Sequence, residues 1–248
     1  MRYRVIFPTI AYFPNLMGFI IYFRDRIHYG TSLDYDANFF LFGEDILAVM
    51  AGKTKPVPYE DALSVIPALQ EDLNSNDFVI FSCYCTVGSI LCNASFLVGR
   101  KQWFFDLKHT VSFGDMSVIC AGGGKPKGKV DAELATWKVN AILNRRSAHC
   151  LRSGKVCIKS IYPLVCTDIA LLSKMRVRNN FLVFAPANEL DSSVLSDYLP
   201  KLRASGYLFI NDPHGGNVWS LPFGKAAKPA QLKEGPRGWY HFLDFELN

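Results

Sequence analysis

The order of apolar and polar stretches along the chain predicts alternating strands and helices. Short apolar runs rich in β-branched and aromatic residues are typical of buried strands. Such runs predict strands at Tyr3–Phe13, Phe19–Phe23, Phe78–Cys85, Ser117–Ala121, Asn180–Phe184 and Tyr207–Ile210. We expect helices within Asp34–Ala51 and at Tyr59–Asn74, Lys101–Thr110, Val130–Leu143, Cys166–Arg178 and Asp191–Ser205. This alternation favours an α/β fold with a central, mainly parallel sheet and helices on both faces.

The chain carries no internal linker that would divide it into domains. Half of the 248 residues are hydrophobic and 20% are charged, which is enough apolar material for a full core and too much for a disordered chain. We therefore expect one domain over residues 1–248. Within it we distinguish an extra N-terminal segment at 1–18, a basic insertion at 139–163 and a C-terminal extension at 211–248.

One apolar stretch raises the alternative of a membrane helix. Val5–Phe23 is nearly uncharged and lies between Arg4 and Arg24. Pro8 and Pro14 interrupt it, and a proline in a helix interior costs about 3 kcal/mol. We therefore expect strands here and no membrane partner.

The cysteines favour a reducing compartment. There are seven, an odd number, and none forms a C-x-x-C pair. Reduced thiols in the cytoplasm are the natural interpretation. Cys83 and Cys85 lie in an apolar run, which indicates a strand interior rather than a metal site.

Positive charge is concentrated in one part of the chain. Residues 125–178 contain twelve lysines and arginines but three acids, a net charge of +9, whereas the whole chain has +5. Clustered basic side chains gain free energy by releasing counterions from phosphates, so this block predicts a surface that binds a polyanion. The alternative is a solvated basic helix face.

Several acids follow predicted strands or begin predicted helices. They are Asp25, Asp131, Asp168, Glu189 and Asp191. Ligands of an open parallel sheet gather beyond the carboxyl ends of its strands. Converging carboxylates repel one another unless a divalent cation neutralises them, so the cluster predicts a Mg²⁺ or Mn²⁺ site that positions a water for phosphodiester cleavage. Taken singly, each acid could instead cap a helix or form a surface ion pair.

A family resemblance joins these observations. The stretch Lys125–Ala135, KPKGKVDAELA, resembles the signature of the NYN family, a branch of the PIN-like ribonucleases. The pattern of strand, acidic turn, helix, glycine and strand over Asn180–Ile210 is similar to that family as well. The similarity extends over roughly residues 20–245. Ala187 and Glu189 stand where the family has aspartates. The resemblance implies a PIN-like three-layer domain.

What the resemblance implies is a metal-dependent endoribonuclease that cleaves single-stranded RNA. Its Mg²⁺ or Mn²⁺ ligands would be Asp25, Asp131, Asp168 and Glu189, with Asp191 as a further acid of the same site. Lys125, Lys127 and Lys129 would grip the RNA backbone, and the basic insertion would add Arg145, Arg146, Arg152 and Lys155. The alternative is a catalytically inactive NYN-like RNA-binding subunit of a ribonucleoprotein assembly, with protein partners or a second copy of itself.

A cysteine hydrolase is a further alternative. The glycine-rich turn NDPHGGN contains His214, and a thiol such as that of Cys83 could pair with it. A cysteine nucleophile usually begins a helix in an activating environment, whereas Cys83 lies in a predicted strand. We therefore favour the nuclease.

Overall fold

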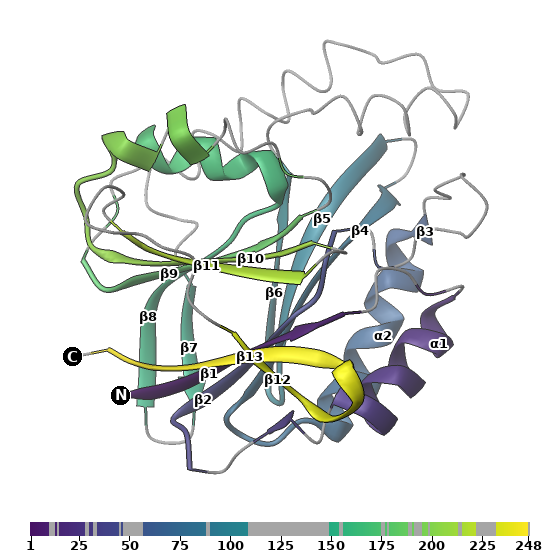
Figure 1. Ribbon diagram of the computed structural model, residues 1–248. Coiled ribbons are helices and arrows are strands. Elements are labelled where there is room, and N and C mark those ends of the chain that lie inside the picture. Colours follow the sequence, from purple (N-terminus) through teal and green to yellow (C-terminus); the bar gives the residue numbers. More distant parts are fainter. Residues whose placement is uncertain are drawn as a thin grey trace.

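The structure is a computed structural model of the chain. It describes residues 1–9, 13, 15–27, 30–31, 34–44, 46, 57–87, 90–108, 149–153, 156–174, 177, 179–187, 190, 195–197, 199–212, 215–221 and 232–247. Within them the chain forms two β-sheets that lie face to face, with helices on the outer side of each sheet (Figure 1). The α/β class is therefore confirmed.

The larger sheet has eight strands in the order β12-β13-β1-β2-β4-β5-β6, and β3 pairs with β4 beside this path. Strands β1, β2 and β4 are parallel, whereas β13, β5 and β6 pair antiparallel at either side. The strands are β1 (Arg2–Pro8), β2 (Ala37–Leu41), β3 (Val57–Pro58), β4 (Asp77–Val87), β5 (Ile90–Gly99), β6 (Gln102–Leu107), β12 (Lys233–Glu234) and β13 (Tyr240–Glu246).

The smaller sheet has five strands in the order β11-β10-β9-β8-β7. Its centre, β8-β9-β10, is parallel, and β7 and β11 pair antiparallel at its edges. The strands are β7 (His149–Ser153), β8 (Val156–Pro163), β9 (Phe181–Pro186), β10 (Gly206–Asp212) and β11 (Gly215–Leu221). All three segments that the sequence sets apart contribute strands: β1 comes from 1–18, β7 and β8 from 139–163, and β11 to β13 from 211–248.

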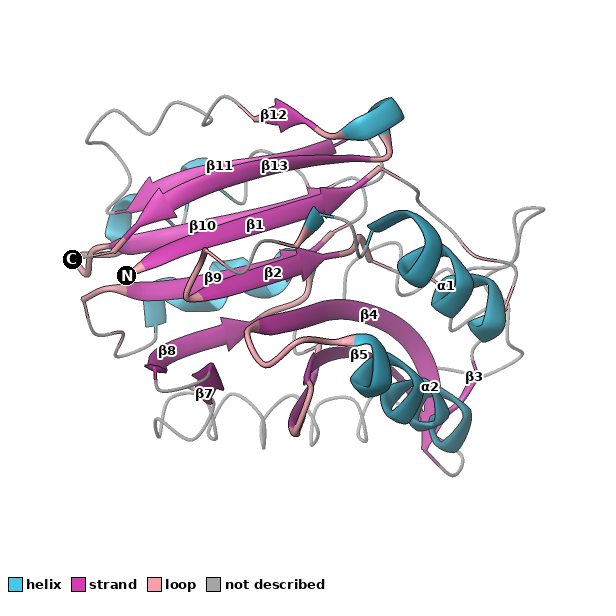
Figure 2. Cartoon of the chain, turned by 90° about the horizontal axis from the view of Figure 1, so that it is seen from below, coloured by secondary structure: helices cyan, strands magenta, loops and turns pink. Residues whose placement is uncertain are grey.

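Aromatic and aliphatic side chains fill the space between the sheets. Phe39 of the larger sheet packs on Phe184 of the smaller one, with ring centroids 4.6 Å apart, and Phe184 stacks on Phe209 at 5.1 Å. Figure 2 shows the strands of the two sheets running in similar directions, as in aligned sheet packing. A PIN-like three-layer domain has one central sheet, so that part of the prediction is wrong: two stacked sheets with helices outside give four layers.

The helices cover the outer faces. Those on the larger sheet are α1 (Leu16–Tyr22), the π-helical η1 (Phe23–Ile27) and α2 (Tyr59–Asp72), and those on the smaller sheet are the 3₁₀ helices η3 (Cys166–Lys174) and η4 (Leu199–Lys201). A last 3₁₀ turn, η5 (Pro236–Gly238), precedes β13. The helix predicted at 59–74 and the strands predicted at 78–85, 180–184 and 207–210 are confirmed.

Two local predictions are wrong for identifiable reasons. Phe19–Phe23 is helical because Asn15 caps the helix at the Gly18 amide and because Phe19 and Phe23 share one buried face. Lys101–Thr110 is not a helix: residues 102–107 form β6, which pairs with β5 across a two-residue turn. The helix predicted within 34–51 is absent from its described residues, where β2 lies instead.

Two further predictions can be compared with the structure. Among the described residues, no helix is both long and apolar enough to cross a membrane, and the stretch 5–23 contributes to β1, α1 and the start of η1. Cys83, Cys85 and Cys166 are thiols, but Cys157 on β8 is disulfide-bonded. The expectation that every cysteine is reduced therefore does not hold for Cys157.

Candidate active site

The carboxyl ends of the central parallel strands of both sheets meet at one edge of the molecule. Asn211, at the end of β10, donates its side-chain amide to the carbonyls of Pro8 and Leu41, which end β1 and β2. The segment after β2 continues beside β9, because the Glu44 amide donates to the Ala187 carbonyl at 3.1 Å. The residues that follow β2 and those that follow β9 therefore lie together, as expected of parallel strands that end at one edge.

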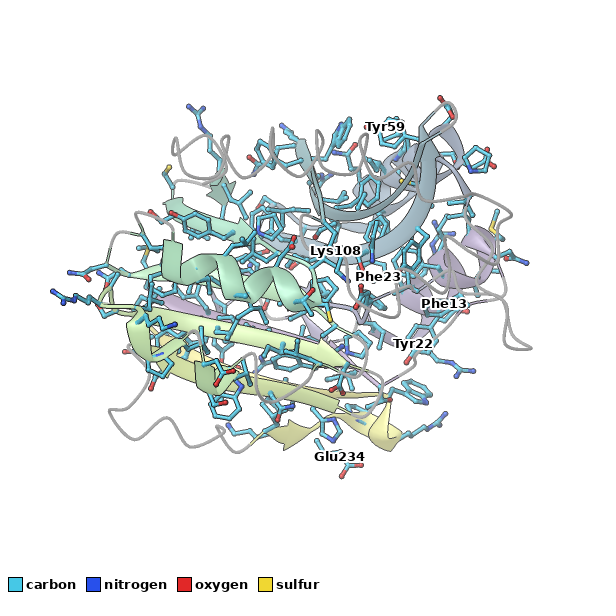
Figure 3. All side chains as sticks on the ribbon, turned by 90° about the horizontal axis from the view of Figure 1, so that it is seen from above. Phe13, Tyr22, Phe23, Tyr59, Lys108 and Glu234 are labelled. Carbon is cyan, nitrogen blue, oxygen red and sulfur yellow. The ribbon has the colours of Figure 1, made fainter. Side chains whose placement is uncertain are left out.

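A buried ion pair occupies this edge. The Lys108 ammonium donates to the Glu44 carboxylate at 2.7 Å, and each side chain is 4% exposed. Asn93 on β5 also donates its Nδ2 to the same Glu44 oxygen at 2.7 Å, and its carbonyl accepts from the Lys108 amide. Figure 3 shows Lys108 among the side chains in the middle of the molecule rather than at its outline. Lys108 and Glu44 neutralise each other, and Asn93 adds a hydrogen bond to each of them. Both buried charges are therefore paired and hydrogen-bonded, as stable burial of a charge requires.

The hairpin β4–β5 presents two different faces. Alternate residues pack on α1 and α2, among them Phe81, Cys83 and Ala94. The residues between them face the smaller sheet, because side chains of a strand alternate and the β4–β5 register is unbroken. On that inner face β4 has Ser82 and β5 has Asn93, both buried. The ion pair therefore lies on the inner face, and the Cys83 thiol lies on the opposite one.

Cys166 follows β8 at the start of η3. It is 4% exposed and has φ = 46°, in the left-handed region that non-glycine residues rarely adopt. Ser160, Asn180 and Arg237 also have positive φ, but Cys166 is the one of the four that opens a helix after a buried strand. A sharp turn from strand to helix is how α/β hydrolases present a nucleophile at the edge of a sheet. Backbone strain of this kind is concentrated at functional sites.

The strand pairing places Cys166 at the same sheet edge as the ion pair. β8 and β9 are parallel neighbours, and the Leu164 amide donates to the Phe184 carbonyl at 2.9 Å. Cys166 is two residues beyond Leu164, and Ala187 is three residues beyond Phe184, so both lie just past the paired ends of β8 and β9. The Ala187 carbonyl accepts a hydrogen bond from the Glu44 amide. Strands of a sheet are about 4.8 Å apart. Across the gap between the sheets, β5, which holds Asn93, contacts β8. The Cys166 thiol, the Glu44 carboxylate and the Lys108 ammonium therefore lie at the same edge.

This arrangement contains the parts of nucleophilic acyl transfer. A thiol can form a covalent intermediate, a neighbouring carboxylate can accept and return its proton, and an ammonium can stabilise a developing oxyanion. Lys108 has three N–H donors, so it can bind Glu44 and an oxyanion at the same time. Because the pair is buried, its charges act in a medium of low dielectric constant, where they act more strongly than in water.

The acids predicted from the sequence do not gather here as a set. Asp25 is exposed on η1, on the outer side of the larger sheet. Asp168 is 1% exposed on η3, two residues after Cys166, so it lies near the thiol. Asp131, Glu189 and Asp191 lie outside the described residues. The structure therefore separates Asp25 from Asp168, and it tests no role for the other three.

Most of the predicted basic residues also lie outside the described part of the chain. These are Lys125, Lys127, Lys129, Arg145, Arg146 and Lys155. Arg152 is described: it is exposed on β7, and its backbone exchanges hydrogen bonds with the Gln102 side chain. RNA, a protein partner or a second copy of the chain each stays a prediction that the described residues do not test.

Sequence reasoning missed Glu44 and Lys108 and assigned Cys166 only to a helix. Glu44 and Lys108 are 64 residues apart, and both lie in segments where helices were expected. Cys166 carried a usable signal, because it follows the apolar run IYPLV and begins the predicted TDIALLSK helix. A cysteine at that junction meets the criterion for a nucleophile that Cys83 fails.

Solved structures of CN-hydrolase proteins are similar to this chain. A CN-hydrolase superfamily protein from Xanthomonas campestris with an arsenic adduct in its active site has a TM-score of 0.57 and 10% identity, over 99% of this chain and 91% of that one. The amidase from Nesterenkonia sp. AN1, solved in complex with acrylamide as a double mutant in which a glutamate became glutamine and a cysteine became alanine, has a TM-score of 0.57 and 11% identity, over 99% and 90%.

A longer protein shares the fold as well. The glutamine-dependent NAD⁺ synthetase from Acinetobacter baumannii has a TM-score of 0.60 and 13% identity, and the match covers 99% of this chain but 46% of that chain. At these identities the likeness shows the fold and not the activity. No protein-family model matches the sequence, and none of the curated proteins matches it either.

These comparisons overturn the nuclease prediction. The neighbours have the CN-hydrolase fold, so the resemblance to the NYN and PIN-like ribonucleases is wrong, together with the metal-dependent endoribonuclease and the inactive NYN-like subunit derived from it. The Mg²⁺ or Mn²⁺ cofactor is wrong for the same reason. Within the described ranges, no three His, Cys, Asp or Glu side chains are placed to hold a metal ion. The short motif at 125–135 misled because a basic turn before a small-residue helix is compatible with many folds.

Proposed function

We propose that this protein is a cysteine-dependent hydrolase that cleaves C–N bonds of amides, with Cys166 as nucleophile, Glu44 as general acid and base, and Lys108 as the oxyanion-stabilising group. One observation carries the proposal: a buried, hydrogen-bonded Lys108–Glu44 pair lies at the sheet edge where Cys166 opens a helix in a left-handed backbone conformation. The CN-hydrolase fold of the neighbours supports it, as does the amidase whose glutamate and cysteine were both replaced.

The chemistry follows from the three groups. The Cys166 sulfur attacks the amide carbonyl carbon while Glu44 accepts the thiol proton, and the carbonyl oxygen becomes an oxyanion beside Lys108. The C–N bond then breaks as Glu44 returns the proton to the leaving nitrogen, which leaves a thioester on Cys166. Water attacks the thioester, Glu44 takes one of its protons, and collapse of the second oxyanion releases the acid. The proton returns to the thiolate, so the enzyme is regenerated.

Asn93 maintains the geometry of this cycle. Its side-chain Nδ2 donates to the Glu44 carboxylate, and its backbone carbonyl accepts a hydrogen bond from the Lys108 amide. A base within hydrogen-bond reach of its proton is a geometric requirement that precedes any question of pKa. Asn93 is therefore a positioning residue for both charged groups.

The test combines turnover with covalent trapping. Wild type is incubated with a panel of short amides, acrylamide included, and ammonia release is followed. Intact-mass spectrometry of quenched samples then locates an acyl adduct. We expect turnover and an adduct on Cys166, both lost in Cys166→Ala and retained in the matched control Cys83→Ala, because Cys83 lies on the other face of β4. Turnover that survives Cys166→Ala would overturn the proposal.

The redox state of Cys157 distinguishes two compartments in which the protein could work. A cytoplasmic location is expected from the sequence, but disulfides persist mainly in oxidising compartments and are rare in the cytosol. The disulfide at Cys157 fits an oxidising compartment, whereas the cysteine pattern of the sequence fits the cytoplasm. Rapid acid quenching of cells followed by alkylation and mass spectrometry of Cys157 decides between the two: an alkylatable thiol supports the cytoplasm, and a disulfide contradicts it.

A further inference from the structure

Asn93 has one polar atom that its positioning role does not use. Its Nδ2 binds Glu44 and its backbone carbonyl binds the Lys108 amide. Its Oδ1 is buried and has no hydrogen-bond partner among the described residues, although the whole residue is 6% exposed. Buried polar atoms in native proteins are nearly always satisfied, so each exception calls for a ligand, a water or a functional reason.

The orientation of this amide is fixed by chemistry. The Glu44 carboxylate accepts hydrogen bonds and donates none when it is ionised, and it is ionised while it pairs with Lys108. The Asn93 atom that faces Glu44 must therefore be the NH₂ donor. The remaining atom is a carbonyl oxygen, which requires an N–H or O–H donor beside the Glu44 carboxylate.

The same inner face of the hairpin carries two more unpartnered groups. Ser82 on β4 and Ser95 on β5 are directly opposite in the register, both fully buried. Neither hydroxyl has a hydrogen-bond partner within the described part of the chain. Together with Asn93, they form a polar strip on the inner face of the hairpin. The same face is apolar nearer the start of β4, where Phe78 and Ile80 belong to the core between the sheets.

We infer that Asn93 Oδ1 accepts a hydrogen bond from the N–H of the leaving group, which makes the enzyme selective for amides that carry an N–H over esters of the same shape. This inference rests on the proposed function. Glu44 must lie within hydrogen-bond reach of the leaving nitrogen to protonate it. Asn93 is bonded to that carboxylate, so its Oδ1 is the acceptor beside that nitrogen. An ester puts an oxygen lone pair against Oδ1 and leaves both atoms without a donor.

The experiment measures a ratio of specificity constants. Wild type and Asn93→Ala are assayed with the N-methyl amide and the methyl ester of one short acid, chosen as the acyl group that wild type hydrolyses fastest. Loss of the Nδ2 hydrogen bond to Glu44 lowers kcat/KM for both substrates, so this part of the effect cancels in the ratio. Loss of the Oδ1 acceptor lowers kcat/KM for the amide alone. We expect the amide-to-ester ratio to fall about tenfold, the size of one net hydrogen bond.

A second variant separates positioning from selectivity. Asn93→Asp keeps an acceptor oxygen but loses the Nδ2 donor to Glu44, so we expect both substrates to slow by at least tenfold with no fall in the amide-to-ester ratio. Thermal melting confirms that each variant is folded. An unchanged ratio in Asn93→Ala, with wild type active on both substrates, overturns this inference and leaves the proposed function standing. Absence of any turnover or Cys166 adduct in wild type overturns the proposed function, and this inference with it.

Discussion

The space between the two sheets is apolar at one end and polar at the other, although the same strands line both ends. At the apolar end, Phe39 and Phe184 pack across the gap with centroids 4.6 Å apart. At the other end, the inner face of β4 changes from Ile80 to Ser82, and that of β5 from Leu97 to Ser95 and Asn93. Strand pairing continues without a break through this change. The backbone ladder therefore extends beyond the core and holds the polar groups that chemistry requires.

The two ends should respond to mutation in opposite ways. Changes at the polar end should abolish turnover, and they should lower the free energy of unfolding only where they leave a buried charge without its partner. Changes at the apolar end should lower the free energy of unfolding while the folded fraction keeps its activity. Site residues are selected for chemistry and core residues for packing. We therefore expect site mutations mainly to lower activity and core mutations mainly to lower stability.

The largest effect should come from Glu44→Gln. Glutamine has nearly the same shape as glutamate, but it cannot accept the thiol proton, so kcat/KM should fall by about 10²–10⁴-fold, the usual contribution of a general base. The control is Phe184→Ala, which should lower the free energy of unfolding by about 3–5 kcal/mol with kcat unchanged at temperatures where it is folded. Amide turnover measures the fall in kcat/KM, and urea unfolding measures the fall in the free energy of unfolding. Full activity in Glu44→Gln would remove it from the mechanism.

The next effect concerns the ion pair itself. Lys108→Met leaves the Glu44 carboxylate buried without its partner, which typically costs about 3–5 kcal/mol. The double variant Lys108→Met with Glu44→Gln removes both charges and should recover most of that stability without recovering activity. Chemical denaturation of the two variants measures the difference. If the double variant is no more stable than Lys108→Met, the cost comes from lost packing rather than from an unpaired charge.

A smaller effect distinguishes the two faces of β5. Ser95 and Ala94 are neighbours whose side chains point to opposite faces. Ser95→Ala removes a buried hydroxyl without a partner in the described residues and should leave stability unchanged or raise it by up to about 1 kcal/mol. Ala94→Ser places a hydroxyl among apolar side chains and should cost about 1–3 kcal/mol. Equal losses in both variants, measured by thermal melting, would contradict the division between the faces.

The smallest effect uses a partly exposed pair away from the site. Burial raises the pKa of Asp244, but hydrogen bonds from Arg4 and Tyr35 and the nearby charge of Arg4 outweigh it, so the net pKa lies below its ordinary value. A lowered carboxyl pKa gives stability that is present above the unfolded-state pKa, about 3.9, and that is lost as pH falls through the folded-state pKa.

The stability difference between wild type and Asp244→Asn should therefore be constant from pH 7 to pH 5 and shrink below pH 4. We expect it to be no more than about 1 kcal/mol, because the pair is partly exposed. Urea unfolding at several pH values measures it. A difference that grows as pH falls would mean that the pKa of Asp244 is raised instead.

The sequence predicted the α/β class and several elements correctly because those elements carry local signals. The helix at 59–72 has apolar residues at helical spacing, and the strand at 181–186 is a short apolar run between polar turns. The stacking of two sheets has no such signal: strands covered by a second sheet and strands covered by helices are both continuously apolar. One central sheet was therefore the natural but wrong expectation.

The site was harder to predict than the fold because its members are distant in sequence. Glu44 and Lys108 are ordinary charged residues until the structure shows them buried against each other. Asp168 attracted attention as an acid on an apolar helix, and it lies two residues from Cys166, which begins that helix. The segment that attracted attention is therefore the one that holds our proposed nucleophile, but its chemistry was assigned to the carboxylate rather than to the thiol.

The hydrogen bond from the Glu44 amide to the Ala187 carbonyl joins the two sheets at the reacting edge. The proposed base Glu44 and the Lys108 ammonium belong to the larger sheet, and the proposed nucleophile Cys166 belongs to the smaller one. Neither sheet alone holds all three groups of the proposed site, so we expect turnover only while the two sheets are packed together. Turnover would therefore report the packing of the two sheets on each other.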